Sequence, residues 1–182
     1  DTSFITTYSA NFGTPSIVIF SISASGVTFA MFSEYFLYAI ILLTSFLIVG
    51  LIFLLLMKKD YLRELPTFFL PNTGNMGIPI CLFAYGKLGM GIAAAISSLV
   101  VLLHFTLNIF LAKREFDLNV IVKSPSFYAI IVTILFLYYE IPLPIFVLNT
   151  VMLLAYGMIV MILMSLGAVS YTHLTLPTRR GG

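Results

Sequence analysis

The chain has 182 residues, of which 60% are hydrophobic and only 9% are charged. Because an ordinary water-soluble domain has about 25% charged residues, this composition excludes that class and indicates a membrane protein. Nine Lys and Arg against seven Asp and Glu leave a net charge of +2, too small for a typical nucleic-acid-binding protein. At about 20 residues per spanning helix, the length allows roughly five or six spans.

Six apolar segments are separated by charged or turn-forming stretches and are predicted to be helices in a bilayer. In chain order they are residues 11–26, 35–57, 66–86, 90–112, 126–139 and 145–169. The stretch before residue 11 is rich in turn-forming residues and lacks the basic start of a signal peptide. Together with Asp1 in the first position, this predicts that the natural N-terminus is missing.

The apolar pattern stops at Val169, and residues 170–182 read SYTHLTLPTRRGG. This stretch resembles translated adapter read-through, so we interpret 170–182 as a non-native, adapter-derived tail. The alternative is a genuine polar loop that carries Arg179 and Arg180.

Lys and Arg are concentrated in alternate loops. Residues 58–65 and 113–125 together carry six of them, whereas Lys87 is the only one in the opposite loops, which are 27–34, 86–89 and 140–144. The positive-inside rule therefore places 58–65 and 113–125 in the cytoplasm. Glu34 and Glu140 then fall at the outer interface, where we interpret them as solvated carboxylates rather than transport groups.

The segment 66–86 contains PNTGNMGIP at residues 71–79, near its centre. Proline removes a hydrogen-bond donor and clashes with the preceding turn, and glycine weakens a helix interior. Two prolines and two glycines so close together predict a broken helix near the bilayer midplane. Irregular backbone at that depth is tolerated only where it is buried in protein or lines a watery cavity.

A broken helix exposes polar backbone groups. We expect the second half-helix to begin near Gly77, with Pro79 in its first turn, and to point free N–H groups and a positive dipole end toward an anion. The carbonyls of residues 70–72 would favour a cation or a donor, and neutral polar side chains are supplied by Asn72, Thr73 and Asn75. This is the plan of a secondary-transporter binding site. The alternative is a proline kink that packs against its neighbours without a ligand.

His104 is the one ionisable side chain expected deep within a predicted span, and Asn108 lies four residues later on the same helical face. Because imidazole titrates near pH 6.5, His104 is a candidate for proton coupling. The alternative is a neutral histidine bonded to a neighbouring carbonyl. Earlier in this span, small residues recur at intervals of four and predict close packing against the broken helix: Gly91 with Ala95, Ala93 with Ser97, and Ala94 with Ser98.

Three stretches together resemble the auxin efflux carrier family, including its bacterial malonate-transporter-like members. FLPNTGNMGIPICLFA at 69–84 resembles the broken fourth helix of that family, and TPSIVIFSIS at 14–23 resembles its second helix. The stretch 124–168, which begins SPSFYAIIV and ends MILMSLGA, resembles helices six and seven. The similarity extends over nearly all of residues 10–168.

The resemblance implies a partial inverted-repeat transporter fold, which when complete has five plus five helices. Residues 1–112 would supply helices two to five of the first repeat, 113–125 a cytoplasmic loop, and 126–169 helices six and seven of the second repeat. Helices two and seven would be repeat mates, and an offset of 144 aligns Phe12-Gly13 with Tyr156-Gly157. Helices two, six and seven would form a scaffold able to make a homodimer, and helices three to five would move.

The resemblance also implies the substrate site, at the crossover formed by Asn72, Thr73, Gly74, Asn75, Gly77 and Pro79. The sequence and the resemblance together predict an all-α, multi-pass protein of the cytoplasmic membrane. We expect it to carry a small organic anion by alternating access, as an incomplete fragment without helices eight to ten. No cofactor, metal or nucleic-acid partner is expected. The alternatives are a channel, a non-transporting scaffold and a membrane-embedded enzyme, although an isolated histidine supplies no recognised catalytic set.

Overall fold

The computed structural model describes residues 2–108 and 122–175. Every regular element in these ranges is helical, so the predicted all-α class is confirmed for the described residues. The elements include three π-helices, which are labelled η. In chain order the elements are α1 (Thr2–Tyr8), η1 (Ser9–Gly13), α2 (Thr14–Ser23), α3 (Phe29–Leu56), α4 (Tyr61–Phe69), η2 (Thr73–Gly77), α5 (Ile78–Leu103), η3 (His104–Asn108), α8 (Pro125–Tyr138) and α9 (Ile145–Thr175).

Within the described ranges, three helical segments are long and apolar enough to cross a membrane. They are Phe29–Leu56, Tyr61–Leu103 and Ile145–Ser165, and α8 is a shorter apolar helix. At 1.5 Å per residue the 28 residues of α3 span about 42 Å, which exceeds the ~30 Å hydrocarbon core of a bilayer. A membrane location is therefore plausible from length and composition.

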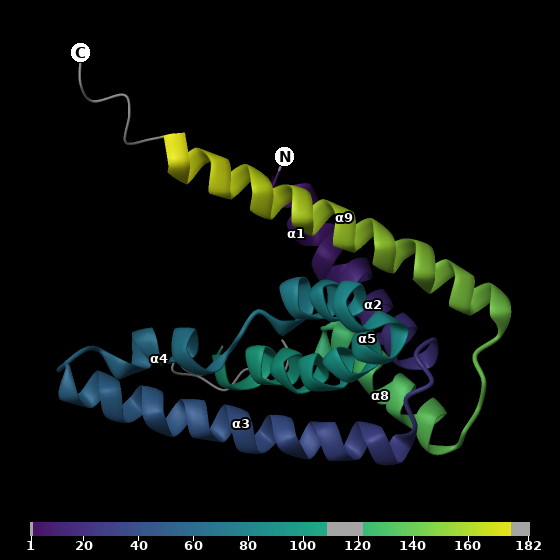
Figure 1. The fold of residues 1–182 in the computed structure, drawn as a ribbon, viewed down its shortest axis with the longest axis horizontal. Helices are drawn as coiled ribbons and strands as arrows, with labels where there is room; N and C mark the ends of the chain where they lie inside the picture. Colours follow the sequence, from purple (N-terminus) through teal and green to yellow (C-terminus); the bar gives the residue numbers. More distant parts are fainter. Residues whose placement is uncertain (1, 109–121, 176–182) are drawn as a thin grey trace.

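The segment Tyr61–Leu103 is not one straight rod, because α5 folds back on itself at Gly86. Gly86 has φ +67° and ψ −157°, a conformation open essentially to glycine alone. Residues 71–75 line one cavity together with Val100, Val101 and His104, whereas a straight helix would separate Asn75 from Val101 by about 39 Å. We call 78–85 the first arm and 87–103 the second arm, and Figure 1 shows them side by side. The predicted boundary between spans 66–86 and 90–112 lies at this turn.

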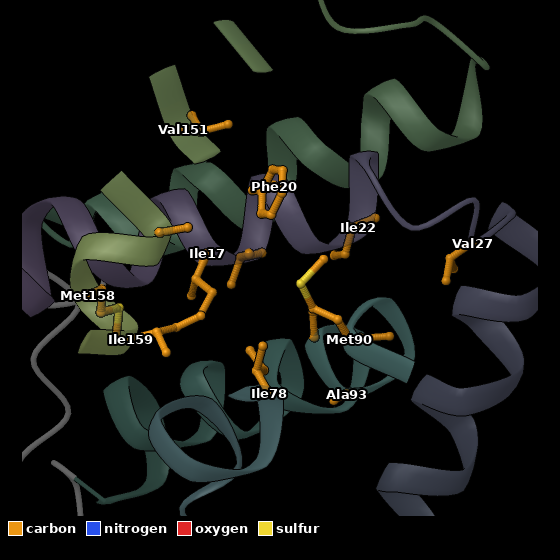
Figure 2. Packing of buried hydrophobic residues seen from close by; sticks show 14 of the residues in the cluster. Ile17, Phe20, Ile22, Val27, Ile78, Met90, Ala93, Val151, Met158 and Ile159 are labelled. Atoms are coloured by element: carbon orange, nitrogen blue, oxygen red, sulfur yellow. The ribbon is translucent and has the colours of Figure 1, made fainter. Parts of the chain in front are cut away.

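The main hydrophobic core is built around α2, which lies between α5, α8 and α9. Figure 2 shows Ile17, Phe20 and Ile22 of α2 among side chains from α5 and α9. A second, smaller cluster joins α3 to α4 through Leu54, Leu65 and Phe69. The long outer surface of α3 remains exposed and apolar, as expected for a helix that faces lipid.

Three predicted helix starts are wrong. The first helix was expected to begin at residue 11, but residues 2–10 are already helical, as α1 and the beginning of η1. The ring of Tyr8 packs against the rings of Phe4 and Phe12 along one face of that helix. The Tyr8 hydroxyl also donates to the carbonyl of Leu154 at 2.8 Å. This contact fixes α1 on α9 and could not be inferred from local sequence.

The broken segment begins at Tyr61 rather than at residue 66. Asp60 caps α4 by accepting from the Leu62 N–H at 3.1 Å, so most of the predicted loop 58–65 is the first turn of a helix. Pro66 is tolerated within α4, and its carbonyl accepts from the Leu70 N–H.

Predicted helix 35–57 corresponds to α3, which begins six residues earlier than expected, at Phe29, because the Thr28 side chain caps it by accepting from the Met31 N–H. Predicted helix 126–139 corresponds closely to α8. α9 begins at Ile145 as expected but continues past Val169 to Thr175, since the next helix breaker in the sequence is Pro177. Most of the predicted loop 113–125, and residues 176–182 of the predicted tail, lie outside the described residues.

Candidate functional site

The predicted break is present between α4 and η2, but it is shorter than expected. Only Leu70, Pro71 and Asn72 are non-helical. The second half begins at Thr73, not near Gly77, because the Asn72 carbonyl accepts from the N–H groups of Met76 and Gly77 at 3.3 and 3.2 Å. That expectation is therefore wrong by about one turn.

A widened turn explains why the glycines and Pro79 do not break the helix further. η2 ends at Gly77, two residues before Pro79. An α-helical proline ring clashes with the carbonyl four residues earlier, here that of Asn75, and a π turn creates room for it. The same arrangement occurs at the N-terminus, where η1 ends two residues before Pro15.

The two π turns share a sequence pattern, Asn-x-Gly-x-Pro, as NFGTP at 11–15 and NMGIP at 75–79. Both turns border one cavity of about 460 Å³, and η3 borders it through His104. All three π turns in the described residues therefore meet at this cavity. Because π turns are frequent at functional sites, the cavity is the candidate site.

The cavity is lined by five separate parts of the chain. The broken helix supplies Pro71 to Asn75, and the second arm with η3 supplies Val100, Val101 and His104. The N-terminal helices, α8 and α9 supply the remaining lining residues, which are Ile5, Ser9, Ala10, Thr14, Ser126, Ile162 and Ser165.

Four of the predicted site residues, Asn72, Thr73, Gly74 and Asn75, line the cavity. Gly77 and Pro79 do not line it: Gly77 is half-buried and Pro79 is buried within α5. His104 also lines the cavity. It is the first residue of η3, which continues directly from α5, and its side chain is exposed. Asn108 ends η3, but its side chain lies outside the described residues.

The broken helix presents unpartnered donors at this cavity. Thr73 donates its backbone N–H to the Pro71 carbonyl at 2.8 Å, and within the described chain no backbone acceptor faces the N–H groups of Gly74 and Asn75. The Thr73 hydroxyl is also buried without a partner there, as is that of Ser9 from η1. A buried hydroxyl without a partner costs about 1–3 kcal/mol, so the residues that line this cavity include two polar groups that the described chain leaves unsatisfied.

The break lies level with the middle of α3. Phe69, the last residue before the break, shares a small apolar cavity of about 170 Å³ with Ile40, Leu43, Thr44 and Leu47. The midpoint of α3 falls at residues 42 and 43. If α3 crosses a bilayer, the break therefore lies near half depth.

Sequence reasoning missed the contributions of η1, α8 and α9 to this cavity. The repeated Asn-x-Gly-x-Pro pattern was a signal that could have identified η1. Ser126 and Ser165 gave no such signal, since a single serine near a helix end or on an apolar helix is common.

In the described ranges, no group of three or more His, Cys, Asp or Glu is arranged to hold a metal ion. Comparison with known proteins finds no matching family model, no matching curated protein and no matching solved structure.

Proposed function

We propose that this chain is part of a secondary transporter that carries a small organic anion across the cytoplasmic membrane by alternating access. One observation carries the proposal: a broken helix, level with the middle of a long apolar helix, faces a cavity with unpartnered backbone N–H groups. Irregular backbone at membrane depth is characteristic of solute sites in carriers.

The chemistry of the broken helix favours an anion. The N–H groups of Gly74 and Asn75 lie at the positive end of a helix and have no backbone acceptor in the described chain. No Asp or Glu is among the residues that line the cavity in the described chain. A carboxylate on the solute would therefore supply the negative charge that this helix end lacks. The cavity volume of about 460 Å³ is within the usual range for a small-molecule site.

Binding of radiolabelled succinate to the chain in phosphatidylcholine nanodiscs tests the site. Asn75→Ala removes a side-chain donor at the helix start and should raise Kd about tenfold or more, because hydrogen bonds to charged groups contribute about 1.5–3 kcal/mol. The matched control is Asn149→Ala, since Asn149 is an exposed asparagine of α9 that does not line the cavity. Equal Kd values for Asn75→Ala, Asn149→Ala and wild type would contradict the site.

Within this proposal His104 carries a coupling proton. Its exposed imidazole lies on the cavity wall, and an imidazole changes charge between about pH 5 and 8. A protonated ring would add positive charge to the anion site, so succinate binding by the wild type should strengthen as pH falls from 8 to 6. His104→Gln should flatten this dependence. The same pH profile in both proteins would remove the proton-carrying role.

A further inference from the structure

A second cavity, of about 260 Å³, lies at the opposite end of α8 from the candidate site. Ser126 near the start of α8 borders the candidate site, whereas Phe136 and Leu137 near its end border this second cavity. The other walls are the turn that joins α2 to α3 and the connection that joins α8 to α9. Because drug-sized ligands occupy sites of about 300–1,000 Å³, the second cavity suits a smaller group.

Hydrogen-bond acceptors gather at this second cavity. Glu140 is the single ionisable residue among the described residues that line it, so no basic side chain of the lining neutralises the carboxylate. Thr133 is 3% exposed and donates its hydroxyl hydrogen within α8 at 2.7 Å, which leaves only lone pairs for a ligand. The Ser23 carbonyl is also free in the described chain, because the Val27 N–H that a continued α2 would bring to it donates to the Ser25 hydroxyl at 3.3 Å. These three acceptors suit a ligand with a positive charge and several N–H donors.

The start of α3 borders the same cavity and carries the opposite partial charge. Thr28 caps this helix by accepting from the Met31 N–H at 3.3 Å. Within the described chain, the N–H groups of Phe29 and Ala30 have no acceptor. A helix start with free N–H groups favours an anionic oxygen. Acceptors for a cation thus lie beside donors for an anion, which is the arrangement that a zwitterion requires.

The residues around this cavity are those expected at a membrane–water interface. α3 begins here at Phe29 and α8 ends here at Tyr138, and the two rings pack edge to face with their centroids 5.1 Å apart. Tyr38, Tyr138 and Tyr139 are exposed, and exposed tyrosines are typical of the headgroup level of a bilayer. If α3 crosses a bilayer, a lipid headgroup is the zwitterion with direct access to the cavity.

Glu140 is held in a backbone conformation that glycine adopts more readily. Its φ is +54°. Its N–H donates to the Leu137 carbonyl at 3.4 Å, and the next N–H, that of Ile141, donates to the Phe136 carbonyl at 2.9 Å. Glycine is the usual residue at this point of a helix end, because the left-handed conformation strains other residues. Glu140→Gly should therefore relieve the backbone while it removes the carboxylate.

We propose that this cavity binds the headgroup of phosphatidylethanolamine, with the ammonium group at Glu140 and the phosphate at the start of α3. A primary ammonium has three N–H donors for the carboxylate, the Ser23 carbonyl and the Thr133 hydroxyl oxygen, whereas the quaternary ammonium of phosphatidylcholine has none. The site therefore selects ethanolamine over choline. It concerns the lipid around the protein and does not depend on the proposed solute site.

Native mass spectrometry tests the headgroup site. The chain in detergent micelles is mixed with phosphatidylethanolamine or phosphatidylcholine of identical acyl chains, and the Kd of each lipid is measured. The wild type should bind phosphatidylethanolamine about tenfold more tightly, because only this lipid makes charge-assisted hydrogen bonds to the acceptors. Glu140→Gln should bring the ratio of the two Kd values close to one. Glu34→Gln is the matched control: Glu34 lies near the same end of α3 but does not line the cavity, so this variant should keep the wild-type ratio.

Glu140→Gly separates binding from folding. It should also remove the preference, without lowering the midpoint of thermal unfolding followed by circular dichroism in lipid-free micelles. Soluble glycerophosphoethanolamine separates a free zwitterion from a lipid, and it should displace phosphatidylethanolamine only at a concentration about tenfold higher or more. Retention of the wild-type ratio by either Glu140 variant, its loss in Glu34→Gln, a wild-type ratio of one, or displacement at equal concentration would each overturn the lipid site. None of these outcomes bears on the proposed function.

Discussion

Gly91 shows how closely the second arm of α5 approaches the rest of the molecule. A Cβ atom at this position would collide with the side chain of Ser25 and would lie 2.8 Å from Cγ2 of Val27. The partner of Gly91 is thus the turn between α2 and α3, so the expectation that it packs on the broken helix is wrong. The other small residues of the pattern are buried as expected.

Substitution of Gly91 tests this close approach. Gly91→Ala should destabilise the protein by about 1–3 kcal/mol, because the added methyl group requires a shift of the neighbouring turn. Thermal unfolding in detergent micelles, followed by far-UV circular dichroism, measures the effect. Gly167→Ala is the control: nothing lies within 4 Å of its added Cβ, and alanine is favoured over glycine within α9 by about 1 kcal/mol. Equal unfolding midpoints for the two variants would contradict the packing.

At the scale of the elements, the apolar runs in the sequence predicted the positions of most of the helices. The helices α8 and α9 are apolar runs bounded by charges or prolines, so their positions follow from the partitioning of side chains into lipid. The start of α3 was not predicted, because Thr28 caps the helix and Glu34 lies inside it. The predicted break was located because Pro71 and the residues after it cannot all belong to a regular α-helix. Its length was not predictable, because a single residue, Asn72, restarts the hydrogen bonding at Thr73.

Only part of the candidate site could be predicted from the sequence. Asn72 to Asn75 and His104 have unusual polarity for a membrane helix, which made them detectable. Ser9 and Ser126 have ordinary polarity, and they become part of the site only through long-range packing, such as the bond of Tyr8 to α9. One sequence feature could have linked the N-terminal helices to the site: the Asn-x-Gly-x-Pro pattern occurs both at 11–15 and at 75–79.

At the scale of the whole molecule, the three loops that carry little positive charge gather at one end. Gly91, just after the turn at Gly86, packs against the turn that follows α2. A cavity of about 260 Å³ joins that same turn to the connection between α8 and α9, at Glu140 to Leu143. Lys58 and Lys59 follow the opposite end of α3, and Figure 1 shows the two ends of α3 at opposite sides of the molecule.

This arrangement predicts opposite accessibility for two lysine positions in a cell membrane. In a Cys81→Ser background, which removes the single native cysteine, Lys87→Cys should react with a membrane-impermeant maleimide in intact cells. Lys59→Cys should react only after the membrane is permeabilised, because the positive-inside rule predicts a cytoplasmic location for the positively charged turn between α3 and α4. Labelling of both cysteines from the same side would place the two ends of α3 in one compartment. The break between α4 and η2 would then lose its position at half depth, and the carrier mechanism would lose its structural basis.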